Sequence, residues 1–379
     1  MLQRFCISII LASAFCAATV SAQMPVPAPP IIGAKSYLLI DSQTGKELAS
    51  LEPDQRLAPA SLTKLMTAYV VFKTLHQDQI QLQDEVTISE KAWRTGGSRM
   101  FVEVGKRVSI QDLVLGMIVQ SGNDASVALA EHIAGSEGVF AEMMNQNAAA
   151  IGMLSSHFVN ATGLPDDNHY STARDLATLA RAIIRDFPDY YKWYSVREFT
   201  WNDIKQDNRN RLLWRDPSVD GMKTGRTDDA GWCLVSSAKR DDMRVISVVL
   251  GTSSDKARID GSHALINYAF RFFETRKLYS AGDEITQARI WKSANEFSRL
   301  GVLEDLYITI PRGAYESLEM IRKLPTILTA PVAAGQPVAD MTVSLHGEEI
   351  LSESLRALED NPRGSIWQRT RDSVSLWFE

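Results

Sequence analysis

Ser61 and Lys64 are the first pair of residues in the chain whose types and spacing can do chemistry. They are three positions apart at the start of an apolar stretch that runs to Val71 and predicts a helix, and residues three apart share one helix face. A serine hydroxyl is a weak nucleophile until a nearby base takes its proton, and a neutral lysine amine can be that base. The alternative is that Ser61 caps the helix and Lys64 is a solvated surface charge.

Two later motifs carry residue types that would complete a site of this kind. Ser121 and Asn123 lie in a predicted loop between two helices, and Lys223 and Thr224 end a predicted strand. The Ser121 hydroxyl can relay a proton between Lys64 and a departing amine, and the Asn123 amide offers both a donor and an acceptor to a peptide backbone. Lys223 and Thr224 suit the recognition of a terminal carboxylate. We also expect Lys223, as a second cation, to lower the pKa of Lys64 if the strand lies beside the helix.

Each motif is weak by itself. Ser-x-x-Lys recurs at 236–239 and at 253–256, and Ser-x-Asn recurs at 293–295, whereas Lys-Thr-Gly occurs once. The three motifs in this order, on a helix, in an interhelical loop and on a strand, are a much stronger signal. Together they are typical of penicillin-binding proteins and related β-lactamases.

By these motifs the chain resembles a low-molecular-mass penicillin-binding protein, a serine-type D-alanyl-D-alanine carboxypeptidase, of the branch with a C-terminal β domain and a membrane-surface helix. The resemblance extends to Asn208-Arg209-Asn210 and to residues 219–225, and it covers nearly everything after the leader. It implies that Ser61 attacks the carbonyl between two D-alanines of a peptidoglycan stem peptide and that water then releases the shortened peptide. It further implies acylation of this serine by penicillin, and a role in cell wall biogenesis and cell shape.

The resemblance also implies roles for two arginines. It places an oxyanion hole at the backbone N–H groups of Ser61 and Arg226, and it gives the Arg226 side chain no fixed role. Arg209 is a candidate ligand for the substrate carboxylate, with a surface loop charge as the alternative. We therefore expect Ser61, Lys64 and Ser121 to be catalytic, and the substrate to be bound by Asn123, Lys223, Thr224, Arg226 and Arg209.

The chain divides into five predicted segments. Residues 1–22 have the basic start, apolar core and small-x-small end of a secretory signal peptide, and residues 23–30 carry four prolines, which favour an extended tether. A catalytic domain is expected over 31–278, a small β domain over 279–358, and an amphipathic helix over 365–379.

The expected fold is α+β: a β-lactamase/transpeptidase-like domain in which helices cover an antiparallel sheet, followed by the small all-β domain and the terminal helix. The pattern predicts a hairpin over 36–51, helices over 109–119, 125–134, 139–151, 173–185 and 257–274, and strands over 219–225, 232–238 and 244–251. Asp124 is a candidate cap for the helix that follows Ser121. In the β domain, strands are predicted over 284–291, 306–310, 327–330 and 341–345.

Composition excludes several other classes of protein. A net charge of −6 with 45% hydrophobic residues describes an ordinary soluble protein without a nucleic-acid footprint. The six histidines show no metal-ligand spacing and no phosphate loop is present, so we expect neither a metal nor a cofactor. Cys6 and Cys16 lie in the predicted leader, which leaves Cys233 as a buried small hydrophobe with no disulfide partner.

The C-terminal stretch 365–378 predicts an amphipathic helix. Drawn as a helix, one side carries Ile366, Trp367, Thr370, Val374, Trp377 and Phe378, and Arg369 and Asp372 lie towards the other. Tryptophans and phenylalanine beside arginines favour a helix that lies in a membrane interface, here the periplasmic face of the bacterial inner membrane. The alternative is a helix docked on the β domain.

Two other functions stay open. A β-lactamase on the same scaffold needs fast deacylation, and the acidic loop residue that class A enzymes use for it has no clear counterpart here. A wall-binding or shape-organising protein with a vestigial site is disfavoured because the motif residues are intact. Carboxypeptidase and endopeptidase activities are both compatible with these motifs.

Overall fold

A five-stranded antiparallel sheet forms the centre of the first domain in the computed structural model, which describes residues 26–377. The strand order is β2-β1-β9-β8-β7, so the two ends of the domain meet where Leu38 of β1 lies opposite Val248 of β9. The strands are β1 (Ser36–Asp41), β2 (Glu47–Leu51), β7 (Val219–Thr227), β8 (Gly231–Arg240) and β9 (Met243–Thr252). The predicted hairpin and the three predicted late strands are confirmed.

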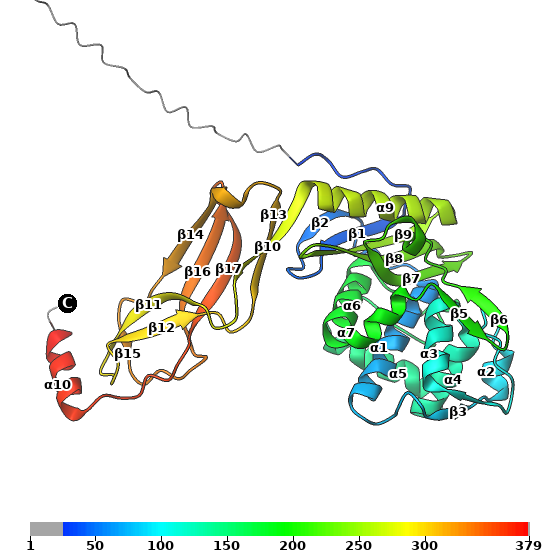
Figure 1. Cartoon of the computed structure of the whole chain (residues 1–379), viewed down its shortest axis with the longest axis horizontal. Helices are drawn as coiled ribbons and strands as arrows, with labels where there is room; N and C mark the ends of the chain where they lie inside the picture. The colour runs from blue at the N-terminus through cyan, green and yellow to red at the C-terminus, as the bar shows by residue number, and fades with distance from the viewer. Residues whose placement is uncertain (1–25, 378–379) are drawn as a thin grey trace, which may run out of the picture.

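Helices cover both faces of this sheet (Figure 1). Because successive strand residues point to opposite faces, Leu38 and Ile40 enter a large core on one side while Tyr37 and Leu39 enter a smaller core beneath α9. The longer helices are α1 (Lys64–His76), α3 (Ile110–Val119), α4 (Asn123–Ala134), α5 (Glu137–Ala150), α6 (Ala173–Asp186) and α9 (Asp255–Phe272).

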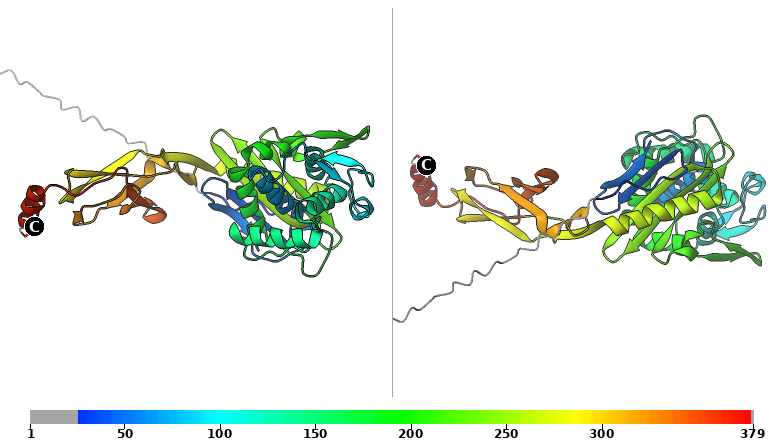
Figure 2. Two further views of the ribbon diagram at one scale, coloured as in Figure 1. Left: turned by 90° about the horizontal axis from the view of Figure 1, so that it is seen from below. Right: turned by 90° about the horizontal axis from the view of Figure 1, so that it is seen from above.

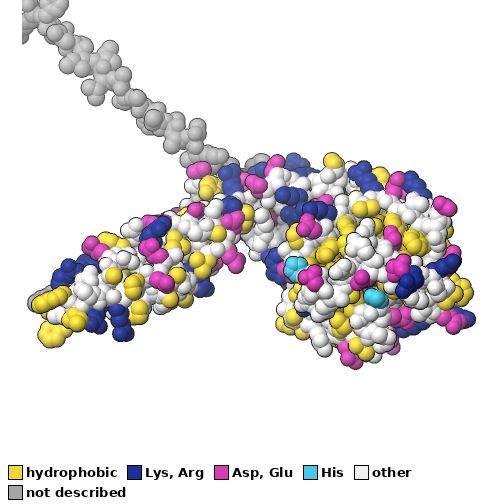
Figure 3. All heavy atoms as spheres, turned by 60° about the horizontal axis from the view of Figure 1, so that its bottom comes forward, with side chains coloured by type: hydrophobic (Ala, Val, Ile, Leu, Met, Phe, Trp, Pro, Cys, Tyr) yellow, Lys and Arg dark blue, Asp and Glu magenta, His cyan; other side chains and the backbone are white. Residues whose placement is uncertain are grey.

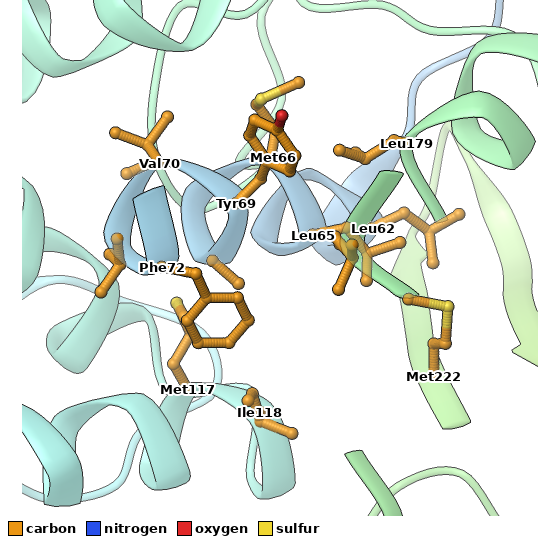
Figure 4. Packing of buried hydrophobic residues seen from close by; sticks show 14 of the residues in the cluster. Leu62, Leu65, Met66, Tyr69, Val70, Phe72, Met117, Ile118, Leu179 and Met222 are labelled. Carbon is orange, nitrogen blue, oxygen red and sulfur yellow. The ribbon is translucent and has the colours of Figure 1, made fainter. Parts of the chain in front are cut away.

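The central helix α1 is buried on nearly all sides. Figure 4 shows Met66 and Tyr69 projecting from one side of the helix and Phe72 from another, and all three side chains are buried. The Phe72 ring stacks on Tyr190 at a centroid distance of 5.0 Å. A helix that is apolar all round belongs in a core, so the start of α1, with the predicted nucleophile, has a rigid position.

The five helices predicted over 109–119, 125–134, 139–151, 173–185 and 257–274 are confirmed, with both ends of each within two residues. Ser109 caps α3 by accepting a hydrogen bond from Asp112 N at 3.1 Å, and Gly135 ends α4 at a φ of +75°. Helix α9 ends at Phe272, whereas the sequence predicts helix to Glu274. Glu274 instead lies in β10, where it pairs with Ile310, because strand pairing outweighs the helical pattern there.

Shorter elements surround the sheet and the helices. Two small hairpins are formed by β3 (Glu85–Thr87) with β4 (Arg107–Ser109) and by β5 (Glu198–Trp201) with β6 (Ile204–Asp207). The short helices are α2 (Glu90–Arg94), α7 (Pro188–Tyr191) and α8 (Leu212–Arg215). Turns of 3₁₀ helix occur at Ala60–Thr63, Lys192–Ser195 and Tyr315–Ser317.

The second domain is all β and lies end to end with the first (Figures 1 and 2). Its six-stranded sheet has the order β14-β16-β17-β12-β11-β15, and β10 pairs with β13 as a separate ribbon. The strands are β10 (Phe273–Tyr279), β11 (Glu284–Trp291), β12 (Phe297–Gly301), β13 (Leu306–Pro311), β14 (Leu318–Lys323), β15 (Leu328–Thr329), β16 (Pro337–Leu345) and β17 (Glu348–Ala357).

A buried hydrogen-bond cluster joins the two domains. The fully buried Asp41 carboxylate accepts hydrogen bonds from the Thr44 hydroxyl at 2.9 Å and from the Thr275 hydroxyl at 2.7 Å. Thr309 of β13 bonds both of these hydroxyls, and its carbonyl accepts from Lys46 Nζ at 3.1 Å. Because buried polar groups are costly to leave unpaired, this cluster fixes how the domains meet.

Helix α10 (Ile366–Ser375) forms the far end of the molecule. Its Ser365 cap accepts from Gln368 N at 3.3 Å, and its Asp372 carboxylate accepts from Lys292 N of the β domain at 2.6 Å. The Trp367 and Trp377 side chains stay 85% and 90% exposed. Among residues 26–377, no helix combines the length and the apolar character needed to cross a bilayer.

Some predictions fall on residues outside this range. The signal peptide, the first part of the tether and Phe378 lie outside the described residues. Residues 26–30 of the tether have no regular secondary structure, and the Pro27 carbonyl accepts a hydrogen bond from the Tyr268 hydroxyl at 2.9 Å.

Candidate active site

Ser61 lies in the 3₁₀ turn that leads into α1, with its side chain next to Lys64. Lys64 Nζ is 3.0 Å from Ser61 Oγ, so the predicted pairing of hydroxyl and amine is present in the structure. Ser61 does not cap the helix as the sequence suggested, because no side chain caps this turn or α1. Its oxygen is bound by the lysine instead, which leaves it ready for nucleophilic chemistry.

The Lys64 amine is buried and has three acceptors. Besides Ser61, it donates to Asn123 Oδ1 at 2.7 Å and to the Thr162 carbonyl at 2.6 Å, and the residue is 1% exposed. Burial lowers the pKa of Lys64 to about 7, with a further lowering by the Arg209 charge against an opposing effect of Asp124. Near neutral pH a large fraction of this amine is therefore uncharged and able to accept a proton.

Lys223 is not the main cause of that pKa shift. Burial is the largest cause, and the neighbouring cation that contributes is Arg209. The pKa of Lys223 is held well below its usual value, first by burial and then by repulsion from the Lys64 charge. Among the described residues, Lys223 Nζ has one hydrogen-bond partner, the Thr224 carbonyl at 3.2 Å, whereas Lys64 Nζ has three.

Ser121 occupies a strained position at the wall of the same cavity. Its φ is +66°, in the left-handed region that favours glycine, and the residue is 3% exposed. Its hydroxyl makes no hydrogen bond within the described part of the chain. A buried hydroxyl held at such a cost in backbone strain and left unpaired is typical of a functional site.

Asn123 is already engaged within the protein. Its Oδ1 accepts from Lys64, its Nδ2 donates to the Gly96 carbonyl at 2.7 Å, and its backbone N–H donates to the Ser98 carbonyl at 2.7 Å. The Asn123 amide was predicted to bind a substrate backbone. In the structure, the amide joins the lysine to the 96–98 loop, so a substrate must compete with, or add to, these bonds.

Asp124 anchors a second loop and does not cap α4, whose N-terminus carries no side-chain cap. Its two oxygens accept from the backbone N–H groups of Met100 at 3.0 Å, Phe101 at 2.9 Å and Val102 at 3.2 Å. The carboxylate thus fixes the loop beside the site, a role that sequence reasoning missed because its partners precede it by more than twenty residues.

Strand β7 is the edge of the sheet and brings Lys223 and Thr224 to the nucleophile. Gly225 has no room for a side chain, since a Cβ there would lie 2.9 Å from the Pro59 carbonyl oxygen. Both Lys223 and Thr224 are buried, at 2% and 4% exposed. The close approach of strand and turn is the arrangement that the Lys-Thr-Gly motif predicted.

The start of β7 is held by a charged network. The Asp220 carboxylate accepts hydrogen bonds from Arg244 Nη1 at 2.8 Å and Nη2 at 2.7 Å. It also accepts one from the Tyr191 hydroxyl at 2.5 Å. Asn210 Nδ2 donates to the Gly221 carbonyl at 2.9 Å. A bidentate pair of this kind restricts both partners, so the network positions the strand that carries Lys223.

The two arginines of the sequence analysis take different positions. Arg209 donates to the Gln120 carbonyl at 3.0 Å and to Ser98 Oγ at 2.9 Å, and it lines the cavity although it is solvent exposed. The Arg226 side chain turns towards Asp228, at 3.0 Å, and lies over the Trp232 ring. Its side chain is thus engaged elsewhere, as the sequence analysis allowed.

These residues surround one cavity of about 500 Å³. Its lining includes Ser61, Ser121, Asn123, Thr224, Arg209 and Arg226. The cavity is also lined by Trp232 and Arg258, which were not predicted as site residues. Arg258 is 5% exposed and donates to the carbonyls of Gly225 at 3.0 Å and Cys233 at 3.2 Å, so it supports the strand from behind.

Among residues 26–377, no group of three or more histidine, cysteine or acidic side chains could hold a metal ion. Cys233 is buried, and burial raises the pKa of its thiol to about 11, as expected of a small hydrophobe. The Ser61 hydroxyl and the Lys64 amine can carry out nucleophilic attack and proton transfer.

Gly163 provides a test of how tightly the nucleophile is positioned. It has a φ of +83°, and a Cβ there would lie 1.8 Å from the Ala60 carbonyl oxygen. We expect Gly163→Ala to displace the turn that carries Ser61 and to slow acylation by a labelled penicillin about a hundredfold. Gly152→Ala is the matched control, because Gly152 has a φ of +88° but no atom near the position of a Cβ. Equal acylation rates in two folded variants would contradict this account.

Comparison with known proteins agrees with this geometry. Residues 22–254 match the family model of D-alanyl-D-alanine carboxypeptidase, and residues 273–363 match that of the penicillin-binding protein 5 C-terminal domain. DacA, a D-alanyl-D-alanine carboxypeptidase of Haemophilus influenzae, is 43% identical over 378 residues, which cover 98% of this chain and 96% of the relative.

Solved structures show the same likeness. Penicillin-binding protein 5 from Haemophilus influenzae superposes with a TM-score of 0.86 at 44% identity, covering 89% of this chain and 100% of that one. Penicillin-binding protein D2 from Listeria monocytogenes in its ampicillin-bound form gives a TM-score of 0.59 at 29% identity, covering 64% of this chain and 100% of that one. A strand, a turn and a loop bring the three motifs together, and relatives match nearly the whole chain. This protein therefore belongs to the D-alanyl-D-alanine carboxypeptidase family of penicillin-binding proteins.

Proposed function

We propose that this chain removes the terminal D-alanine from peptidoglycan stem pentapeptides through an acyl-enzyme on Ser61, and that β-lactams acylate the same serine. The observation that carries the proposal is the buried Lys64 amine, which lies 3.0 Å from Ser61 Oγ and has a pKa lowered to about 7. Such an amine can take the hydroxyl proton as Ser61 attacks the carbonyl carbon between the two D-alanines.

The other site residues have roles that follow from their positions. As the C–N bond breaks, the Ser121 hydroxyl passes a proton to the departing amine. This role suits a hydroxyl that has no hydrogen-bond partner among residues 26–377. The backbone N–H groups of Ser61 and Arg226 stabilise the oxyanion. Water then cleaves the ester and frees the shortened peptide.

Recognition of the substrate depends on its terminal carboxylate. Lys223, Thr224 and Arg209 bind this group, and Asn123 orients the peptide backbone. A carboxylate that approaches Lys223 favours the charged form of this lysine, so binding and protonation of Lys223 are coupled.

The direct test measures D-alanine released from a pentapeptide by purified protein. We expect the wild type to release D-alanine and Ser61→Ala to release none, because the acyl group then has no acceptor oxygen. Labelled penicillin should appear, by mass mapping, on the peptide that contains Ser61. Ser253→Ala, in a second Ser-x-x-Lys sequence on an exposed loop, is the control and should keep full activity. Label on another residue would contradict the assignment.

The pH dependence follows from the pKa of Lys64. The neutral amine is the active base, so the acylation rate should rise with pH around 7 and level off about one to two pH units higher. Lys64→Arg cannot deprotonate in this range and should lose about a hundredfold to ten-thousandfold in acylation rate. Lys73→Arg, on the same helix but bonded to Asn147 at 2.7 Å, should behave like the wild type. A rate that is flat between pH 6 and 9 would exclude Lys64 as the base.

One observation and two measurements separate this function from the alternatives. No carboxylate of the described residues hydrogen-bonds to Ser61 or Lys64, so the deacylating group of a class A β-lactamase has no equivalent at these atoms. Stable labelling by nitrocefin is therefore expected in place of fast turnover. Measurable D-alanine release would exclude a vestigial site.

We further propose the arrangement of the chain at the membrane. A signal peptide over 1–22 directs export and a tether over 23–30 precedes the catalytic domain (31–278). The β domain (279–358) then carries the amphipathic helix (365–379) to the periplasmic face of the inner membrane. Hydrophobic and cationic side chains gather at the end that carries α10 (Figure 3). The exposure of Ile366, Trp367, Val374 and Trp377, at 57% or more, favours a membrane surface over docking on the β domain.

Removing this helix tests the attachment. A chain that ends at Gly364 should no longer float with liposomes containing anionic lipid, while its acylation by penicillin stays normal. Partial burial of four large apolar side chains provides several kcal/mol, enough for reversible binding, and Arg369 and Arg371 add an attraction that salt weakens. Trp367→Glu with Trp377→Glu should act like the truncation. Flotation that persists without the helix would contradict the proposal.

A further inference from the structure

His169 is a buried histidine near the nucleophile that the reaction described above does not use. The residue is 3% exposed. It does not line the catalytic cavity, whereas Thr162, Gly163 and Leu164 of the neighbouring loop do. Because buried polar groups need hydrogen-bond partners, any contribution of His169 to the reaction must pass through the residues that its ring binds.

The partners of the two ring nitrogens define one tautomer. The backbone N–H of Val159 lies 3.2 Å from His169 Nδ1 and can only donate, so Nδ1 is an acceptor without a proton. A neutral imidazole then carries its proton on Nε2, and this N–H donates to Thr63 Oγ1 at 2.7 Å. The Phe158 ring packs edge-on against the imidazole at a centroid distance of 5.7 Å. The ring therefore has one orientation and two directed bonds.

The first of these bonds reaches the segment that carries the nucleophile. Thr63 is fully buried, ends the 3₁₀ turn that contains Ser61, and directly precedes Lys64. No side chain caps this turn. The bond from the histidine to the Thr63 hydroxyl is thus a side-chain restraint on the end of the turn, one residue away from the catalytic lysine.

The second bond reaches the loop that supplies an acceptor to the lysine. This loop, 159–163, contacts the start of α1 at two further points. Lys64 Nζ donates to the Thr162 carbonyl at 2.6 Å, and the Thr67 hydroxyl donates to the Ala161 carbonyl at 2.7 Å. The histidine binds the first residue of the loop, so a single imidazole joins the nucleophile's turn to the loop that helps to hold the lysine amine.

We propose that His169 is a positioning residue for acylation, which in its neutral form holds the Ser61 turn and the 159–163 loop in register. The inference rests on the proposed function, in which Ser61 and Lys64 must stay within hydrogen-bonding distance as the proton is transferred. His169 binds neither of these two side chains and acts only through Thr63 and the loop.

This role requires an uncharged ring. A protonated imidazole has an N–H on both nitrogens, so it could not accept from Val159 and would add a cation near Lys64. Burial lowers the pKa of His169 to about 4, His157 and Lys64 lower it further, and Asp166 opposes them. The ring is therefore neutral throughout the pH range in which Lys64 loses its proton.

Two amide variants separate the two bonds. His169→Gln places an amide NH2 near the position of Nε2, where it can donate to Thr63. His169→Asn is shorter and places an amide oxygen near Nδ1, where it can accept only from Val159. We expect His169→Asn to lower the acylation rate constant at saturating labelled penicillin about tenfold, because the buried Thr63 hydroxyl loses its donor. His169→Gln should stay within threefold of the wild type.

The noncovalent affinity and a double variant distinguish positioning from general loosening of the fold. Affinity for penicillin before acylation should stay within twofold in both variants, because the proposed carboxylate-binding residues are unchanged. Adding Thr63→Val to His169→Asn should slow acylation no further, since both changes remove the same bond. The control is His157→Gln, whose ring bonds the Asn168 carbonyl at 2.6 Å and not the turn; it should match the wild type. Equal rates for the Asn and Gln variants, or additive effects in the double variant, would overturn the inference.

A measurement on the wild type avoids any dependence on how the variants fold. In the full chain labelled with ¹⁵N-histidine, the His169 signals are those that His169→Gln lacks. We expect NMR to show a protonated Nε2 and an unprotonated Nδ1 between about pH 5 and 8. A proton on Nδ1, or a charged ring at pH 6, would overturn the inference. Because this measurement needs no catalysis, a wild type that takes up no penicillin would refute the proposed function and leave the hydrogen-bond assignment intact.

Discussion

Burial of the Lys64 amine is the constraint on which the catalytic domain depends. An ammonium removed from water is strongly disfavoured unless acceptors surround it, and here the nucleophile, an asparagine and a backbone carbonyl supply them. Those three acceptors come from the turn before α1, from the start of α4 and from the 160–164 loop. Segments about a hundred residues apart must therefore meet at one nitrogen for the lysine to be buried at all.

This requirement explains features that are otherwise unrelated. The left-handed backbone of Ala60 and of Ser121 bends two segments towards the amine, and Gly163 lets a third approach the Ala60 carbonyl without a clash. His169 contacts the same turn, with its ring Nε2 at 2.7 Å from Thr63 Oγ1. Burial lowers the pKa of this histidine to about 4. A neutral imidazole adds no charge beside an amine that must lose its proton easily.

The sequence was informative where function depends on local spacing. Ser61 with Lys64 and the Lys-Thr-Gly strand were predicted because their partners lie on one helix face or one strand. Contacts between distant segments escaped prediction: Asp124 binds a loop more than twenty residues before it, and Arg258 binds β7, which also precedes it in the chain. The assignment of the Lys64 shift to Lys223 was wrong for the same reason, because burial is a property of the assembled core that no spacing reveals.

The two ends of the molecule place different demands on the fold. At the active site, cationic side chains outnumber the carboxylates that pair with them, which suits an anionic substrate. At the far end, the tryptophans of α10 are exposed. The Asp41 cluster lies between them and joins β1 to β10 and β13 through short buried hydrogen bonds. With the domains end to end (Figure 2), the β domain lies between the catalytic domain and α10. A helix lying on a bilayer as proposed would then hold the catalytic cavity well away from the lipid, on the side where peptidoglycan is found.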